Sequence, residues 1–250
     1  MENKERMYHI GLTKSDIEGA KYAILPGDPG RVSKIARMLD SYKPIAVNRE
    51  FTSYLGTIDN EKVLVISTGI GGPSTAICVE EIALLGIETV IRVGTSGGMQ
   101  QDVNSGDLVI ASSAIRQEGT TKEYVPVEFP AVADIDVLNA LIESAKNLGY
   151  PYHTGVIQSK DSFYGQHSLE KMPVGYELKN KWNAWIKAGC LASDMETAAV
   201  YIVSQIRGIK AGSVLSVIWN QEQSGGTEDF STERSIKTAV DAIRILIKRK

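Results

Sequence analysis

Short apolar runs rich in β-branched residues alternate with helical patterns along most of the chain. Residues 22–25 and 89–93 are two such runs, and a glycine turn follows each of them directly. Strands that alternate with helices favour a mostly parallel sheet with helices on both of its faces. The sequence therefore predicts an α/β fold.

The pattern gives a set of expected elements. Strands are expected at residues 22–25, 51–58, 62–67, 89–93, 107–114, 154–159 and 213–218, and helices at residues 31–39, 75–85, 134–148, 179–187, 195–205 and 233–249. Three of the helices end at Gly86, Gly149 or Gly189, which suit a C-cap position. There is no internal repeat, low-complexity segment or linker, so we expect one domain over residues 1–250.

Charge and hydropathy exclude several classes of protein. The net charge is −3 over 250 residues, which argues against a general nucleic-acid binder. The N-terminus has no secretory pattern, and the apolar runs are too short to span a bilayer. We therefore expect a cytoplasmic protein that binds neither membrane nor nucleic acid. Cys78 and Cys190 lie in apolar surroundings and are expected to be buried thiols.

Gly27-Asp28-Pro29-Gly30-Arg31 lies between an expected strand and an expected helix. Asp28 and Pro29 suit the N-cap and first position of that helix, so the segment is explained by turn chemistry alone. It also suits anion binding, because a helix N-terminus exposes backbone N–H groups and Arg31 adds a planar donor fork.

Arg92 occurs within an apolar strand and precedes Gly94-Thr95-Ser96-Gly97-Gly98. A buried arginine is costly unless it is paired or faces a cleft. The glycines and hydroxyls that follow suit an anion site, and ligands bind at the carboxyl ends of such strands. We therefore favour a binding role for this segment.

Two further segments have a structural and a functional interpretation. Asn48-Arg49-Glu50 resembles the charged start of a surface strand. Ser193-Asp194-Met195-Glu196 matches a capping box, in which Glu196 would accept from the Ser193 N–H. Alternatively, the two oxygens of the Glu196 carboxylate suit a vicinal diol and would stabilise positive charge on a sugar ring.

These segments together resemble the hexameric nucleoside phosphorylases. The match rests on Gly27–Arg31, Asn48–Glu50, Ser67–Ser74, Arg92–Thr95 and Met195-Glu196, which occur in the order of that family and extend over nearly the whole chain. The resemblance implies a three-layer αβα domain with a mixed, mostly parallel central sheet. It also implies a homohexamer built as a trimer of dimers, with active sites shared between subunits.

The resemblance also implies a role for each matching residue. Phosphate, the co-substrate, would be bound by Gly27, Arg31, Arg92, Thr95 and a neighbour's Arg49, and ribose by Glu196, Met195 and a neighbour's His9. No cofactor would be required. A monovalent cation, potassium, would lie between subunits on Glu50, Ile70 and Ser74.

The segment Asp161-Ser162-Phe163-Tyr164-Gly165-Gln166 resembles the uracil-recognition segment of the uridine-cleaving members. Phe163 would stack on the base with Ile218 nearby, and the Gln166 amide would pair with uracil N3–H and O4. Those members usually carry an arginine two residues beyond the glutamine, where this chain has Ser168. Lys171 or His167 would have to replace it.

The expected activity is phosphorolysis of uridine to uracil and ribose 1-phosphate, a pentosyl transfer catalysed by Glu196, Arg92 and Gln166. The alternative is a purine nucleoside phosphorylase, although the aspartate of those enzymes is missing after residues 213–218 and only Glu222 lies near. An adenine-nucleoside hydrolase and a non-catalytic nucleoside-binding protein are further alternatives. A dinucleotide-dependent dehydrogenase is disfavoured, since no G-x-G-x-x-G follows the first strand.

Overall fold

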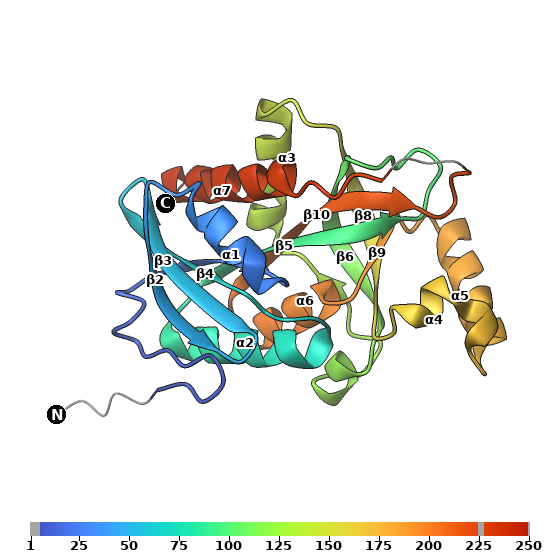
Figure 1. Cartoon of the computed structure of the whole chain (residues 1–250), viewed down its shortest axis with the longest axis horizontal. Helices are drawn as coiled ribbons and strands as arrows, with labels where there is room; N and C mark the ends of the chain where they lie inside the picture. Colours follow the sequence, from blue (N-terminus) through green and yellow to red (C-terminus); the bar gives the residue numbers. More distant parts are fainter. Residues whose placement is uncertain (1–5, 225–227, 250) are drawn as a thin grey trace.

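The computed structural model describes residues 6–224 and 228–249, and every strand within these ranges joins one sheet (Figure 1). The strands are β1 (Tyr22–Pro26), β2 (Ser41–Asn48), β3 (Phe51–Ile58), β4 (Glu61–Ile66), β5 (Thr89–Gly98), β6 (Leu108–Gln117), β7 (Ala131–Val132), β8 (Tyr152–Lys160), β9 (Ala192–Asp194) and β10 (Lys210–Asn220). The helices are α1 (Pro29–Ala36), α2 (Gly72–Leu85), α3 (Ile135–Asn147), α4 (Tyr164–His167), α5 (Gly175–Lys187), α6 (Thr197–Ile206) and α7 (Glu233–Lys248), with 3₁₀ turns η1 (Thr120–Glu123) and η2 (Leu169–Lys171).

β5 is the central strand of the sheet. It pairs in parallel with β1 and β10 and antiparallel with β9. Because β10 pairs with β6, β6 with β8 and β8 with β9, the strands β5, β10, β6, β8 and β9 form a closed ring. β1 continues the sheet outward through β4 and β3 to β2 at the edge. The mixed sheet is confirmed, with five parallel and five antiparallel pairings among the described strands.

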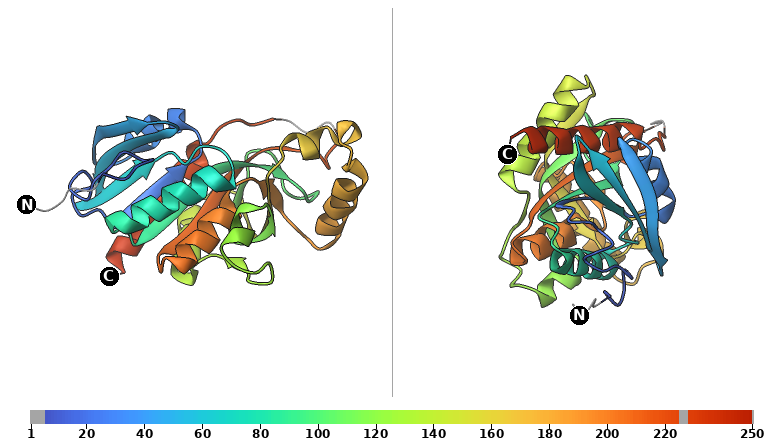
Figure 2. Two further views of the ribbon diagram at one scale, coloured as in Figure 1. Left: turned by 90° about the horizontal axis from the view of Figure 1, so that it is seen from below. Right: turned by 90° about the vertical axis from the view of Figure 1, so that its left-hand side faces the viewer.

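Helices cover both faces of this sheet. One buried apolar cluster lies under α1, α3 and α7, and a second lies under α2 and α6. Figure 2 shows α2 and α6 side by side on one face. A small third cluster around Met99 and Trp182 fixes α5 at the end of the molecule remote from β2 (Figure 1). The three-layer αβα arrangement is thus confirmed.

All of the expected strands and helices are present, but β2, β7, β9 and α4 were not expected from the sequence. β2 is a largely exposed edge strand that contains Pro44, which an edge position tolerates because no neighbour needs its missing N–H. β9 has only three residues and exists through its pairing with β5 and β8. β5 also continues beyond the expected range as far as Gly98.

The expected capping box does not form. Ser193 lies within β9, and Glu196 is the residue that precedes α6. The first turn of α6 is capped by Asp194, whose Oδ2 accepts from the Thr197 N–H at 3.1 Å and from Thr197 Oγ1 at 2.6 Å. The Glu196 carboxylate is therefore free to face away from its own helix.

Both cysteines are buried, and burial raises the pKa of each thiol, that of Cys190 to about 12. They are inert core residues, as expected. Among the helices in residues 6–224 and 228–249, none combines the length and apolar content needed to cross a membrane.

Candidate active site

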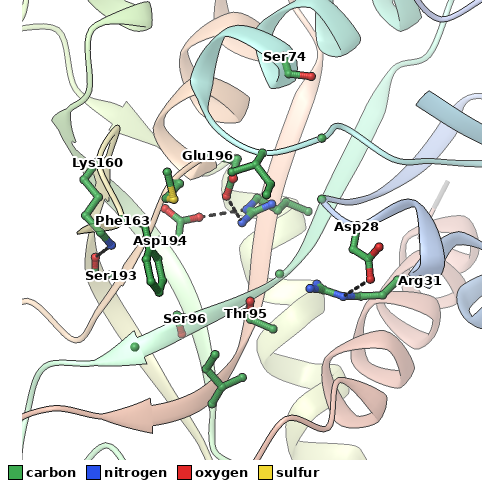
Figure 3. Close-up of a pocket in the computed structure, with 18 of the residues that line it drawn as sticks. Asp28, Arg31, Ser74, Thr95, Ser96, Lys160, Phe163, Ser193, Asp194 and Glu196 are labelled. Atoms are coloured by element: carbon green, nitrogen blue, oxygen red, sulfur yellow. Dashed lines mark hydrogen bonds and ion pairs between the residues drawn. The ribbon is translucent and has the colours of Figure 1, made fainter. Parts of the chain in front are cut away.

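A cavity of about 620 Å³ lies where several strands end (Figure 3). Its walls come from the turn after β1, from the segment between β4 and α2, from β5 between Arg92 and Gly97, and from the ends of β8, β9 and β10. This is the edge at which parallel sheets commonly bind ligands. Figure 3 shows Arg31 and Asp28 at one end of the cavity, Lys160, Phe163 and Ser193 at the other, and Glu196 between them.

The N-terminus of α1 forms one end of the cavity. Asp28 is its N-cap, as expected, and the Asp28 carboxylate accepts from the Gly30 N–H at 2.8 Å. Arg31 is one turn further on, with Nε 3.7 Å from Asp28 Oδ2. Burial, together with the nearby positive charge of Arg92, lowers the pKa of Arg31, while Asp28 opposes this shift. An anion here would meet a helix N-terminus and a guanidinium.

Arg92 lies in β5 with only 3% of its surface exposed. Its Nε donates to Asp194 Oδ2 at 3.0 Å and its Nη2 to Glu196 Oε2 at 2.5 Å. Although burial opposes it, these two carboxylates raise the pKa of Arg92, so the guanidinium stays charged. The third nitrogen, Nη1, is buried and has no hydrogen-bond partner among the described residues. It is a donor available for a bound anion, and Thr95 lines the same wall.

Gly94 gives Arg92 the room that this position needs. A Cβ at Gly94 would lie 2.7 Å from Arg92 Nη2 and 2.7 Å from Leu215 Cδ2. Gly27, which follows β1, also allows a close contact, since a Cβ there would lie 3.2 Å from the Gly69 carbonyl oxygen. Gly94 thus permits the close approach of Arg92 and Leu215, and Gly27 that of the Gly69 backbone.

Glu196 lies between the two ends of the cavity with 7% of its surface exposed. Its Oε1 accepts from the Gly71 N–H at 2.7 Å, while Oε2 accepts from Arg92. Burial raises the pKa of this carboxyl, and the Arg92 guanidinium opposes the shift. Met195, next to it, also lines the cavity. A buried carboxylate with remaining lone pairs is suited to accept from hydroxyl groups of a ligand.

The opposite end of the cavity is aromatic. The rings of Phe163 and His167 lie 4.2 Å apart, and those of His167 and Trp219 lie 5.0 Å apart. Ile218 completes this wall. Burial lowers the pKa of His167, and the nearby Lys160 lowers it further, so the imidazole is neutral at pH 7. This end suits a flat, uncharged ring.

Gln166 is buried at this aromatic end, and hydrogen bonds hold both the oxygen and the nitrogen of its amide. Its Oε1 accepts from Ser193 Oγ at 3.0 Å, and its Nε2 donates to Gln221 Oε1 at 3.1 Å. These contacts fix which side of the amide is the carbonyl. They leave one N–H donor and one acceptor lone pair for a ligand.

Sequence reasoning missed Lys160, which lines the cavity and is 7% exposed. Its Nζ donates to Ser193 Oγ at 2.6 Å. Burial lowers the pKa of Lys160 to about 8, against the opposing effect of Asp194 and Glu196. The available signal was its place directly after an apolar strand and directly before the expected base-recognition segment.

The structure does not bring Lys171 into the cavity. Lys171 is exposed in η2 and is not among the lining residues, so its expected contact with the base is not supported. Glu222 is also outside the cavity, because its carboxylate accepts from Trp182 Nε1 at 2.8 Å. It is therefore poorly placed to replace the aspartate of the purine enzymes.

His9 and Arg49 also lie outside the lining of this cavity. His9 Nδ1 lies 2.6 Å from Glu81 Oε1, and the Arg49 guanidinium lies 5.5 Å from the centre of the exposed Tyr8 ring. Their expected role is in a neighbour's site, and within one chain it stays a prediction.

The expected cation ligands lie together beside the cavity. Ser74 Oγ is 2.7 Å from Glu50 Oε1, and Glu50, Ile70 and Ser74 all line the cavity wall. The hydrogen bond from Ser74 lowers the pKa of Glu50, so this carboxylate is ionised at neutral pH. Elsewhere in the described ranges, no cluster of three or more His, Cys, Asp or Glu side chains is arranged to hold a metal ion.

Known proteins resemble this chain over nearly its full length. The family model of the phosphorylase superfamily matches residues 21–249. A uridine phosphorylase of Treponema pallidum is 52% identical, with 96% of this chain and 94% of that protein covered. A uridine phosphorylase of Escherichia coli is 40% identical over 98% of this chain and its own full length. A guanosine phosphorylase of Halorubrum lacusprofundi is 37% identical, with 96% and 95% covered. A full-length match of this kind, on a cavity with an anion end and an aromatic end, shows that the chain belongs to the phosphorylase superfamily.

Proposed function

We propose that this protein is a uridine phosphorylase, a pentosyltransferase that converts uridine and phosphate into uracil and ribose 1-phosphate. The observation that carries the proposal is the order of groups along one cavity. Two arginines and a helix N-terminus come first, a buried carboxylate follows, and an oriented amide lies at the aromatic end. That order matches phosphate, ribose and base.

Phosphate would bind at the anion end. Gly27, Arg31, Arg92 and Thr95 all line the cavity, and Arg92 Nη1 has no hydrogen-bond partner among the described residues. Guanidinium groups suit phosphate because their forked N–H donors match its oxygens. A phosphate bound there would attack C1′ from the face opposite the base, with inversion.

Glu196 would hold the ribose hydroxyls and stabilise the reaction. As the bond between C1′ and N1 lengthens, positive charge develops on the sugar ring. The Glu196 carboxylate, which is buried and paired with Arg92, and the bound phosphate would both face this charge. Electrostatic stabilisation is strong in such an environment, since the groups need not reorganise.

Gln166 and Phe163 would select the base. Phe163 offers a ring face for stacking, and Gln166 retains one donor and one acceptor, which match uracil O4 and N3–H. The relatives that are uridine phosphorylases support this assignment. The guanosine phosphorylase relative keeps a purine nucleoside as the second candidate, although Glu222 is engaged by Trp182.

A hydrolase of the same superfamily and a non-catalytic nucleoside-binding protein are less well supported. A hydrolase would use water and would have no need for Arg31 and Arg92 at the anion end. A protein that binds without catalysis would have no need for a buried Glu196 paired with Arg92 next to the sugar.

The remaining parts of the proposal concern assembly. We propose a cytoplasmic homohexamer in which His9 reaches the ribose 5′-hydroxyl and Arg49 the phosphate of a neighbouring subunit. A potassium ion fits the oxygens of Glu50, Ile70 and Ser74, because carboxylate, carbonyl and hydroxyl groups suit hard cations. When bound, it would supply a fixed positive charge that holds the subunit contact.

Base release from uridine, thymidine, inosine and methylthioadenosine, each with and without phosphate, tests the proposal. We expect uracil release that requires phosphate, with inosine inert. Inosine cleavage would favour the purine enzyme, and cleavage without phosphate would favour a hydrolase. Nucleoside binding without turnover of any substrate would favour a binding protein.

A further inference from the structure

Lys160 is a buried cation at the end of the cavity where the base would bind. It is the last residue of β8, and Figure 3 shows its ammonium group beside Ser193 and Phe163, at the end remote from Arg31. The Lys160 Nζ has three donors, and Ser193 Oγ accepts one of them at 2.6 Å. No described carboxylate forms an ion pair with it. A buried ammonium that is only partly satisfied is costly for stability, which suggests a ligand that completes its contacts.

The other charged groups of the cavity are arranged differently. Arg31 and Arg92 face the anion end, while the lining residues around the aromatic end are Phe163, His167 and Trp219. His167 is neutral at pH 7, because burial and Lys160 lower its pKa. Among the described residues, Lys160 is therefore the positively charged side chain at the end of the cavity where the base would bind.

We infer that Lys160 donates to a carbonyl oxygen of the departing uracil and stabilises the uracil anion, a role for which this chain lacks an arginine at Ser168. This inference rests on the proposed uridine phosphorolysis and names the group that assists departure of the base. The bond between C1′ and N1 breaks, and its electron pair stays on uracil, delocalised over N1 and the carbonyl oxygens. A phosphate oxygen forms the new bond to C1′, and the proton of hydrogen phosphate ends on uracil.

Ser193 is the positioning residue for this arrangement. Its hydroxyl accepts from Lys160 Nζ and donates to Gln166 Oε1, so one group anchors both side chains that would contact the base. Because Gln166 Oε1 accepts from Ser193, the Gln166 Nε2 group points the other way. It donates one N–H to Gln221 and keeps the second for the ligand. The hydroxyl of Ser193 thus sets the distance between the Lys160 ammonium group and the Gln166 amide.

The protonation state of Lys160 agrees with the role. Burial lowers its pKa to about 8, and the carboxylates of Asp194 and Glu196 oppose a larger shift. At neutral pH the group therefore keeps its proton. Asp194 itself is engaged by Arg92, Ser159 and Thr197, so it does not neutralise Lys160 by direct contact.

The test compares Lys160→Met with the matched variant Lys179→Met, which replaces an exposed lysine of α5. Phosphorolysis of uridine and of 5-fluorouridine is measured over a range of phosphate concentrations. Fluorine withdraws electrons from the ring, so 5-fluorouracil departs with less help. We expect Lys160→Met to lower kcat for uridine on the order of 100-fold, as loss of one charge-stabilising donor does, and the loss for 5-fluorouridine to be clearly smaller. The KM for phosphate should stay within about twofold, because that end of the cavity is intact.

Several outcomes would overturn the inference. Equal losses for the two substrates would mean that Lys160 acts through the fold, and unchanged uridine turnover would mean that it has no role. A comparable loss in Lys171→Met, selective for uridine, would return the role to Lys171. Wild-type protein that does not cleave uridine with phosphate would overturn the proposed function as well, whereas an active wild type with an unaffected Lys160→Met variant would overturn this inference alone.

A second variant covers the case in which Lys160→Met does not fold. Ser193→Ala keeps the charge but removes its anchor, and it changes a single buried hydroxyl. We expect a smaller loss with the same preference for 5-fluorouridine over uridine. Equal effects on the two substrates in Ser193→Ala would again overturn the inference.

Discussion

Arg92 Nη2 and Glu196 Oε2 lie 2.5 Å apart in the interior of the cavity, and this contact links the proposed phosphate site to the proposed ribose site. Asp194 holds the same guanidinium from the other side at 3.0 Å. The three side chains form one buried charged unit. Removing Arg92 leaves both carboxylates without their partner, and removing either carboxylate leaves Arg92 with one, so each replacement affects more than one function of the site.

Replacement of Glu196 by Ala should lower kcat for uridine on the order of 100-fold or more, because the developing charge on the sugar loses its partner. Arg92→Ala should raise the KM for phosphate. Since the two residues touch, the double variant should lose clearly less than the product of the two single effects. Steady-state kinetics measures all three, with the exposed Glu61→Ala as control. Multiplicative effects would show that the two residues act independently.

Gly94→Ala should impair both folding and phosphate binding. The added Cβ would lie 2.7 Å from Arg92 Nη2 and from a methyl group of Leu215, so one of them must shift. We expect a loss of about 1–3 kcal/mol in the free energy of unfolding, together with a raised KM for phosphate. Urea denaturation and phosphate titration measure the two effects.

Gly119→Ala is the matched control for Gly94→Ala. A Cβ at Gly119 would meet only Asp161 Oδ2, at an ordinary 3.5 Å. A Gly94→Ala variant that binds phosphate normally would show that Arg92 does not contribute to phosphate binding from its observed position.

The pH dependence of uridine turnover should follow Lys160. Its pKa is about 8, so the ammonium is lost as the pH rises through that value, and assistance to the departing base is lost with it. We expect kcat to fall on the alkaline side in the wild type and the fall to be absent in Lys160→Met. The groups that face Lys160 are the carboxylates of Asp194 and Glu196, which oppose the lowering of its pKa, and His167, whose own pKa is lowered by burial and by Lys160. Parallel pH profiles of the two proteins would contradict the assignment.

Lys160 should also reduce the stability of the fold. Its pKa in the folded state is about 8, below the ordinary 10.5, so the unfolded chain binds more protons between these values. The penalty is fully present below pH 8 and is relieved as the pH rises toward 10.5. Lys160→Met should therefore be more stable than the wild type at pH 7, by ~1–3 kcal/mol. Thermal or urea unfolding at pH 7 and pH 10 measures the difference, and a less stable variant would indicate a structural role.

Mixing two inactive variants should restore activity if sites are shared between subunits. In a pair of one Glu196→Ala and one Arg49→Ala subunit, one of the two sites takes Glu196 from the second subunit and Arg49 from the first. Both residues are intact in that site. Random reassembly of equal amounts should therefore recover roughly one site in four. The measurement is uridine turnover after joint refolding, with each variant refolded alone as the control. Recovery no greater than the sum of the controls would show that Arg49 serves its own chain.

Local chemistry explains which features could be predicted from the sequence. Asp28 and Pro29 form the N-terminus of α1 as expected, because capping depends on a few adjacent residues. Of the two interpretations of Ser193-Asp194-Met195-Glu196, the capping box is not formed, because Asp194 caps the helix and Glu196 pairs with Arg92, more than 100 positions away in the chain. Lys160 was missed for a related reason. Its partner Ser193 is adjacent only through the pairing of β8 with β9, which local sequence does not encode.

The length of β5 has a further consequence. Arg92 lies near its start and Gly97 near its end, and both line the same cavity. An extended strand rises about 3.3 Å per residue, so these positions are about 16 Å apart along the backbone. The strand therefore fixes the distance between the anion end and the base end of the cavity, and neither end can move to fit a substrate of a different length. Changes of base preference would then fall on the segment after β8 and on the end of β10, which both line the base end, while the phosphate end would stay the same.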